Sequence, residues 1–415
     1  ANMIPAQVFK SGENNPESLR LGESGQLIGF SRLTDTIAHS FTVAKTGSGK
    51  GQDKIATIAE SYPLGMNWCI AEVGNTYAWV VEGFGGSYTQ IDPGNTVVNP
   101  LPLYKLADNT AKRPLKSLII GPTLGALSFL LTDGRTALTV HEEAAAQNAL
   151  QLLYATPVSN VEAPVLPDLY HELENLHCPI KEQKEAAQAM AKNLYSFLST
   201  TEGRIFTEQT NLKLTEGITG VDLKNVERAS PKLLKFYLIF LALQFDHFAF
   251  GQRNPTTILL DEMHKFIRIA PDEIGKLISE LARMGRKDAA NIDIVTQGTT
   301  EIDAIEKEVI NSMQFRSLMY RGDEWDEIGK RIHMAEAPLN IWKNFPDPMK
   351  FNWRPSLQSV GSSNYHLHLT FPHLLLDLGN SNPNDLDMKD RIAKQTKDPL
   401  ERLSLFRQYK EGVLK

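Results

Sequence analysis

The stretch Ser40-Phe41-Thr42-Val43-Ala44-Lys45-Thr46-Gly47-Ser48-Gly49-Lys50 decides the fold. Its first five residues read as a short buried strand, and residues 50–61 have helical character that stops before Pro63. Small residues between a strand and a helix let backbone N–H groups surround phosphate oxygens, and the helix N-terminus adds its dipole. A lysine at the end of such a loop neutralises charge on a γ-phosphate. The stretch therefore predicts a phosphate-binding loop.

We expect this loop to bind ATP together with Mg²⁺. The predicted nucleotide-binding residues are Thr46, Gly47, Ser48, Gly49, Lys50, Gly51 and Gln52. Gly51 departs from the usual pattern, which has Ser or Thr at this position to ligate Mg²⁺. Two interpretations stay open: a water takes the coordination position, since Mg²⁺ keeps waters readily, or hydrolysis is weak or absent.

A second motif is the apolar run from Thr257 to Leu260, which ends in Asp261 and Glu262. A buried strand would deliver Asp261 to the metal and Glu262 to the attacking water as its base. Strands often end in acidic residues, so this motif gains its meaning from the loop at Lys50. We predict Asp261 as the metal ligand, and Lys50 and Glu262 as catalytic residues.

Two further features are candidates for contact with the γ-phosphate. The strand Ile292 to Thr296 ends at Gln297, which fits a residue that senses the γ-phosphate and equally an amide that caps the next helix. Arg283, Arg286 and Lys287 share one helix face by their spacing. They are either a solvated basic face or a source of an arginine that reaches a neighbouring subunit's nucleotide.

Histidines and cysteines do not suggest a further metal site. His264 lies close in sequence to Glu262, but a structural role is expected for it. His366 and His368 share one strand face without a Cys or acidic partner at ligand spacing. Cys69 and Cys178, the two cysteines, lie far apart, which favours neither zinc nor a disulfide.

Composition places the chain among globular proteins. Of its 415 residues 42% are hydrophobic and 22% charged, which excludes wholesale disorder. Lys and Arg total 43 against 49 Asp and Glu, and the net charge of −6 speaks against a dedicated nucleic-acid binder, although a motor can hold a basic stripe in a pore. The uncharged stretch from Ser117 to Thr132 is too short to span a membrane, and no signal peptide opens the sequence. We therefore expect a soluble chain.

Strands and helices alternate along most of the chain, which predicts a mostly parallel sheet covered by helices. Helix-forming Glu, Ala, Gln and Leu dominate between about Leu115 and Leu212, where we expect an all-α insertion with faces for docking partners. The predicted domains are a lead-in with the first half of the α/β core (1–114), the all-α insertion (115–212), the second half of the core (213–380) and a helical tail (381–415).

An ordered set of short elements carries a family resemblance. They are His39, Thr46-Gly47-Ser48-Gly49-Lys50, Glu72-Val73-Gly74-Asn75-Thr76-Tyr77, Gly85-Gly86-Ser87-Tyr88, Ile91-Asp92-Pro93, Asn99-Pro100, Thr201-Glu202-Gly203-Arg204-Ile205-Phe206, Leu260-Asp261-Glu262, Arg283 to Lys287, and Thr296-Gln297. Together they resemble the large ATPase of type IV secretion and conjugation systems, the VirB-four/TraC family, within the HerA/FtsK group of RecA-like motors. Glu72 stands where that family usually has Asp. A member of the type IVB branch, of the DotO or TraU kind, is one option.

The resemblance implies a RecA-like core and an ATP hydrolase that works on the cytoplasmic face of a bacterial inner membrane. It implies a homo-hexamer that contacts other secretion ATPases and inner-membrane subunits. It also implies that this chain is the C-terminal ATPase part of a longer protein. The glycine at position 51 is similar to the TraG/TraD coupling proteins in this respect. A coupling protein of that type, or a HerA/FtsK-like DNA translocase, therefore stays an alternative function. A nucleotide-binding scaffold with little hydrolysis is the alternative from another functional class.

Overall fold

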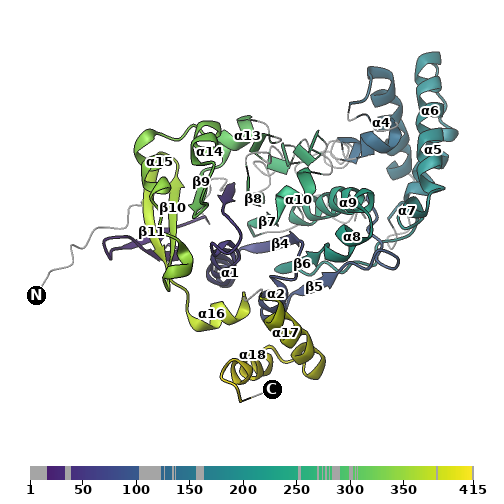
Figure 1. Cartoon of the computed structure of the whole chain (residues 1–415). Helices are drawn as coiled ribbons and strands as arrows, with labels where there is room; N and C mark the ends of the chain where they lie inside the picture. The colour runs from purple at the N-terminus through teal and green to yellow at the C-terminus, as the bar shows by residue number, and fades with distance from the viewer. Residues whose placement is uncertain are drawn as a thin grey trace, which may run out of the picture.

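The computed structural model describes most of the chain (Figure 1). The described residues are 16–32, 39–101, 123–125, 127–132, 135, 137–155, 163–250, 254–268, 271–272, 274–275, 278–279, 281–282, 290–298, 302–303, 305, 307–379 and 382–413. Within them, no helix is both long and apolar enough to cross a membrane.

A nine-stranded sheet forms the centre of the molecule, with strand order β11-β10-β9-β3-β8-β7-β4-β6-β5. Its strands are β3 (Ser40–Val43), β4 (Asn67–Glu72), β5 (Ser87–Gln90), β6 (Ile218–Asp222), β7 (Thr256–Leu260), β8 (Ala290–Thr296), β9 (Phe315–Met319), β10 (Arg354–Val360) and β11 (Ser363–Leu369). The strands from β9 to β5 in that order run parallel, whereas β10 pairs antiparallel with both β9 and β11. A separate hairpin, β1 (Ser18–Leu21) with β2 (Leu27–Phe30), meets β11 through a bridge between Gly22 and Leu367.

Helices cover both faces of the parallel part of the sheet. Successive side chains of a strand point to opposite faces, and β4 shows where each face packs. Trp68 and Ile70 share a core cluster with α1 (Lys50–Ser61) and α2 (Ala78–Gly83). Cys69 and Ala71 belong to the larger cluster, which contains α9 (Pro231–Phe250). Because both faces are buried, β4 has no exposed residue.

The remaining helices and turns connect or flank these layers. They are η1 (Tyr62–Leu64), α8 (Lys224–Ala229), α10 (Met263–Ile267), α13 (Lys307–Ser312), α14 (Trp325–Arg331), α15 (Glu336–Lys343) and η2 (Pro348–Lys350).

The segment predicted as an all-α insertion is helical in its described part. It contains α4 (Val140–Ala155), α5 (Leu166–Glu174), α6 (Lys181–Leu198) and α7 (Thr201–Arg204), which Figure 1 shows beyond α9. Phe197 and Phe206 contact Phe236 of α9, with ring centroids 4.7 and 6.1 Å away. The helices thus share one continuous apolar core with the sheet, and the domain boundaries stay a prediction.

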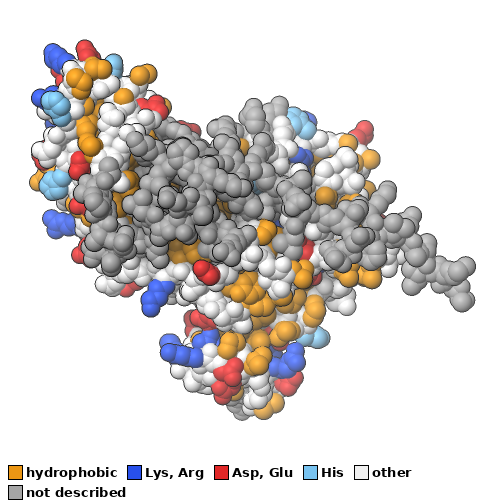
Figure 2. Space-filling model, turned by 180° about the vertical axis from the view of Figure 1, so that it is seen from behind, with side chains coloured by type: hydrophobic (Ala, Val, Ile, Leu, Met, Phe, Trp, Pro, Cys, Tyr) orange, Lys and Arg blue, Asp and Glu red, His pale blue; other side chains and the backbone are white. Residues whose placement is uncertain are grey.

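Three helices end the chain below the sheet in Figure 1: α16 (His373–Leu378), α17 (Pro383–Gln395) and α18 (Pro399–Lys410). Phe406 of α18 packs edge-on against Trp79 of α2, and Arg402 forms an ion pair with Glu82. Hydrophobic side chains gather on this lower part of the molecule in Figure 2, and α16 and α18 include the exposed Leu374 and Leu400.

Most of the predicted elements agree with the structure. The helix from Lys50 to Ser61 has the predicted bounds, and the strand from Thr256 to Leu260 contains the apolar run expected from Thr257 to Leu260. Residues 74–77 form a loop with positive φ at Gly74 and Asn75, and α2 starts after this loop at Ala78. β10 and the helices α14–α16 were not predicted, whereas α17 and α18 lie in the segment 381–415 that was expected to be helical. The helix face expected for Arg283, Arg286 and Lys287 lies outside the described residues.

Candidate nucleotide site

The loop between β3 and α1 has the backbone geometry that phosphate binding requires. Gly47 and Gly49 have φ values of 84° and 98°, which glycine alone adopts without strain. The Ser48 hydroxyl donates to the carbonyl oxygen of Lys45 at 2.6 Å and closes the turn. Gly49 caps α1, so the free N–H groups of the first helical turn face the loop.

Lys50 reaches the two carboxylates that follow β7. Its Nζ donates to Oε1 of Glu262 and lies 3.6 Å from Oδ1 of Asp261. The side chains of Lys50 and Asp261 are only 11% and 4% exposed. These charges are therefore largely shielded from water. Interactions between charges are stronger in such a buried environment than in water. The two motifs that the sequence places more than 200 residues apart form one cluster.

Gln297, at the end of β8, belongs to the same cluster. Its Nε2 donates to Oε2 of Glu262 at 2.8 Å, and its Oε1 accepts from the hydroxyl of Thr46 at 3.1 Å. The amide thus connects the loop to the acidic end of β7, and its role towards the γ-phosphate stays a prediction.

Glu262 is held in an unusual conformation. It adopts φ 60° at the N-terminus of α10, where a residue other than glycine is strained. His264 Nδ1 lies 3.1 Å from Oε2 of Glu262, so this histidine contacts the site, and the structural role expected from the sequence stays a prediction.

Asp261 is fixed by Tyr77, for which the sequence predicted no role at the site. The Tyr77 hydroxyl donates to Oδ2 of Asp261 at 2.8 Å. Burial, with the negative charge of Asp261, raises the pKa of Tyr77 well above its usual value, so the hydroxyl keeps its proton. The loop before Tyr77 is anchored by Glu72, which accepts from the backbone N–H groups of Thr76 and Tyr77, each at 2.8 Å.

Arg354 of β10 is a second neighbour of the loop that the sequence did not reveal. A Cβ atom placed on Gly49 would lie 2.9 Å from its Cγ. The guanidinium donates to the carbonyl oxygens of Pro348, Phe351 and Trp353. The loop therefore passes so close to this side chain that only glycine fits.

Some predicted site residues lie elsewhere. Gln52 points away from the cluster, and its amide donates to the carbonyl oxygen of Leu376 in α16 at 3.3 Å. Gly51 faces Thr76, whose Cγ2 lies 3.2 Å from where a Cβ on Gly51 would be. Arg283 and Arg286 lie outside the described residues.

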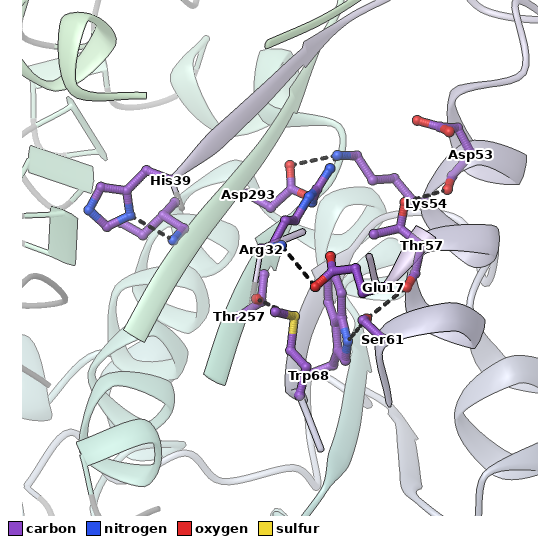
Figure 3. Close-up of polar contacts among 12 residues, drawn as sticks. Glu17, Arg32, His39, Asp53, Lys54, Thr57, Ser61, Trp68, Thr257 and Asp293 are labelled. Carbon is purple, nitrogen blue, oxygen red and sulfur yellow. Dashed lines mark hydrogen bonds and ion pairs between the residues drawn. The ribbon is translucent and has the colours of Figure 1, made fainter. Parts of the chain in front are cut away.

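A buried ion cluster connects α1 to the strand that carries Gln297. Figure 3 shows Lys54 of α1 and Arg32 pointing at Asp293 of β8. Lys54 Nζ lies 2.6 Å and Arg32 Nη1 3.3 Å from this carboxylate. Burial lowers the pKa of Lys54, and Asp293 opposes that effect. The cluster fixes the helix behind the loop relative to β8.

The residues present fit a nucleotide with Mg²⁺. Backbone N–H groups and Lys50 suit phosphate oxygens, and carboxylate oxygen is a preferred ligand of Mg²⁺. A Cβ placed on Gly47 would meet no atom within 4 Å, so the space beside this part of the loop is open. Lys50 contacts two carboxylates, and a phosphate carries negative charge as they do. The lysine side chain can therefore bind a phosphate in the same way.

The parallel sheet, the loop between β3 and α1, and the acidic end of β7 define the RecA-like class of P-loop NTPase folds. The structure of VirB4 of Thermoanaerobacter pseudethanolicus has this fold, with a TM-score of 0.65 and 17% identity over 88% of this chain and 99% of that chain. The predicted resemblance is thereby confirmed at the level of the fold.

Two structures of the plasmid-conjugation protein TrwB are also similar, at TM-scores of 0.49 and 0.48 and 11% and 12% identity. One is the unbound coupling protein and the other a complex with ADP and Mg²⁺; each match covers 80% of this chain and 84% of the other. The sequence matches no known protein-family model, and no curated protein matches it.

Proposed function

We propose that this chain binds and hydrolyses ATP with Mg²⁺ at the cluster around Lys50, as the motor subunit of a type IV secretion or conjugation apparatus. The observation that carries the proposal is the meeting of Lys50, Asp261, Glu262 and Gln297 at the ends of neighbouring strands. The VirB4 fold supports the assignment to secretion.

Each side chain has a distinct part in the proposed reaction. Lys50 binds the β- and γ-phosphates, and Asp261 holds Mg²⁺, which neutralises charge on the phosphates when bound. Glu262 accepts the proton of the attacking water. Gln297 contacts the γ-phosphate and, through its bond to Glu262, links that contact to the base.

A neighbouring subunit would complete the site. We propose that Arg283 or Arg286 reaches the nucleotide of the next subunit in a homo-hexamer, at the cytoplasmic face of the inner membrane with other secretion ATPases and membrane subunits as partners. Mixing Lys50→Ala subunits with Arg283→Ala/Arg286→Ala subunits tests this, because activity returns only if the arginine acts between subunits.

One observation favours a second candidate function. Gly51 has no hydroxyl to offer the metal, so a nucleotide-binding scaffold with little hydrolysis is the competing proposal. Binding and turnover must therefore be measured separately.

Nucleotide binding is tested first with Lys50→Ala. We expect the variant to lose tight ATP binding in calorimetry, because a triphosphate loses its main fixed positive charge. Lys181→Ala is the matched control, since it removes the same charge from an exposed position on α6. Equal ATP affinity for Lys50→Ala and the control would overturn the site.

A further inference from the structure

The loop from Gly74 to Tyr77 contacts both Asp261, the proposed metal ligand, and Gly51 of the phosphate-binding loop. The Tyr77 hydroxyl holds Asp261, the proposed metal ligand. Its neighbour Thr76 lies against Gly51, the position at which the phosphate-binding loop lacks a hydroxyl. One short loop therefore contacts the carboxylate of Asp261 and also the position where a serine or threonine hydroxyl would otherwise ligate the metal.

The Thr76 side chain lies close enough to Gly51 to take the place of a side chain at that position. Thr76 Cγ2 lies 3.2 Å from the position of a Cβ on residue 51. Rotation about χ1 between staggered positions, by about 120°, brings the hydroxyl of threonine to the place that its methyl occupied. The Thr76 hydroxyl would then occupy the side facing Gly51.

Nothing among the described residues keeps that hydroxyl where it is. It makes no hydrogen bond to another described residue, and it lies 3.8 Å from where a Cβ on Gly74 would be. The backbone of Thr76, in contrast, is fixed by the N–H bond to Glu72 and by the bond from Gly74 N–H to Asp222. A fixed backbone with a hydroxyl that is not already held by a hydrogen bond suits a ligand that is recruited when the metal arrives.

We propose that the hydroxyl of Thr76 ligates Mg²⁺ in place of the side chain that Gly51 lacks. This inference rests on the proposed function, because it concerns the metal that accompanies the nucleotide. It also gives a reason for glycine at position 51: a larger residue would crowd the Thr76 side chain. The chain would thus hold its metal with one hydroxyl from a different loop.

The test measures binding of a fluorescent ADP analogue, in EDTA and across a Mg²⁺ titration. We expect Thr76→Ala to keep the metal-free ADP affinity and to weaken the Mg²⁺ affinity of the ADP complex about tenfold or more. Thr76→Ser should stay within a few-fold of the parent protein, because it keeps the hydroxyl.

A reciprocal exchange makes the test specific. Gly51→Thr alone should bring no gain, because its Cβ meets the Thr76 methyl. In the double variant Gly51→Thr/Thr76→Ala that methyl is gone, and Mg²⁺ affinity should return towards the parent value. A merely structural role of Thr76 predicts no such recovery.

The outcomes separate this inference from the proposed function. If the parent protein binds no ADP with or without Mg²⁺, the proposed function fails. If the parent binds ADP in a Mg²⁺-dependent way and Thr76→Ala shows the same Mg²⁺ affinity, a water fills the coordination position and only the assignment of Thr76 is overturned.

Discussion

Gly49 illustrates how one residue shapes the phosphate-binding loop. Its φ of 98° is left-handed, and Arg354 fills the space beside it. A left-handed conformation costs residues other than glycine about 1–2 kcal/mol. The position is thus restricted by both the backbone and a neighbour.

Gly49→Ala should weaken ATP binding at least about tenfold, because about 1.4 kcal/mol of strain corresponds to that factor. Removing the neighbour in Gly49→Ala/Arg354→Ala should restore only part of the affinity, since the φ strain remains. Gly94→Ala is the control: it has an ordinary φ and nothing within 4 Å of its added Cβ. ATP affinity unchanged in Gly49→Ala by calorimetry would show that the loop does not need this geometry.

At the residue scale, the sequence predicted the site residues that belong to a motif. It did not predict the residues that contact the motif from other parts of the chain. Lys50, Asp261 and Glu262 were predicted because their spacing relative to strands is regular, and the structure brings them together. No role at the site was predicted for Thr76, Tyr77 or Arg354, although the first two belong to an element that carries the family resemblance. Their nearness to the loop depends on strand order and not on any local pattern. Their roles, like those of the predicted residues, are proposals.

Between elements, the contact of α1 with β8 depends on buried charge. Asp293 is fully buried and faces the two cations Lys54 and Arg32 (Figure 3). Removing one partner of a buried ion pair leaves uncompensated charge, which costs about 3–5 kcal/mol.

Asp293→Asn should therefore lower the free energy of unfolding by about 3–5 kcal/mol in denaturant titrations. Glu185→Gln provides the control, since it breaks an exposed pair with Lys181 and should change stability by less than about 1 kcal/mol. A loss as small as the control's would mean that Lys54 and Arg32 find other partners when Asp293 is neutral.

Helices and strands with a clear hydrophobic pattern were predicted from the sequence. A strand with many polar residues, β10, was not. β7 and α1 have clear patterns and were predicted, α1 with its bounds. β10 contains Pro355 and several polar residues, and a proline argues against a strand inside a sheet. Only its pairing with β9 and β11 makes it a strand.

At the scale of the whole molecule, Lys389 joins the C-terminal helices to the body. Its Nζ donates to the carbonyl oxygen of Leu378 and lies 5.1 Å from the ring centroid of Trp79 and 5.3 Å from that of Phe406. Burial lowers the pKa of Lys389 to about 7; Lys410 lowers it as well, while Asp385 and Asp377 oppose the shift.

A lysine whose folded-state pKa is depressed contributes stability that is present above its unfolded pKa of about 10.5 and is lost as the pH falls through about 7. Stability should therefore decrease between those values on acidification, by at most about 1.4 kcal/mol per pH unit. Lys389→Met should flatten this dependence, and denaturant unfolding followed by Trp fluorescence at pH 7, 8 and 9 measures it. Parallel pH profiles for the two proteins would contradict the assignment.

The central claim, hydrolysis of ATP with Glu262 as the base, is tested most directly by Glu262→Gln. ATP binding and steady-state phosphate release should be measured on the same preparations of parent protein and variant, at concentrations where subunits assemble. The account predicts that the variant binds ATP as the parent does and that its turnover falls about 10²–10⁴-fold, because the attacking water loses its base. Turnover by Glu262→Gln at the parent rate, or no turnover by the assembled parent protein, would contradict it.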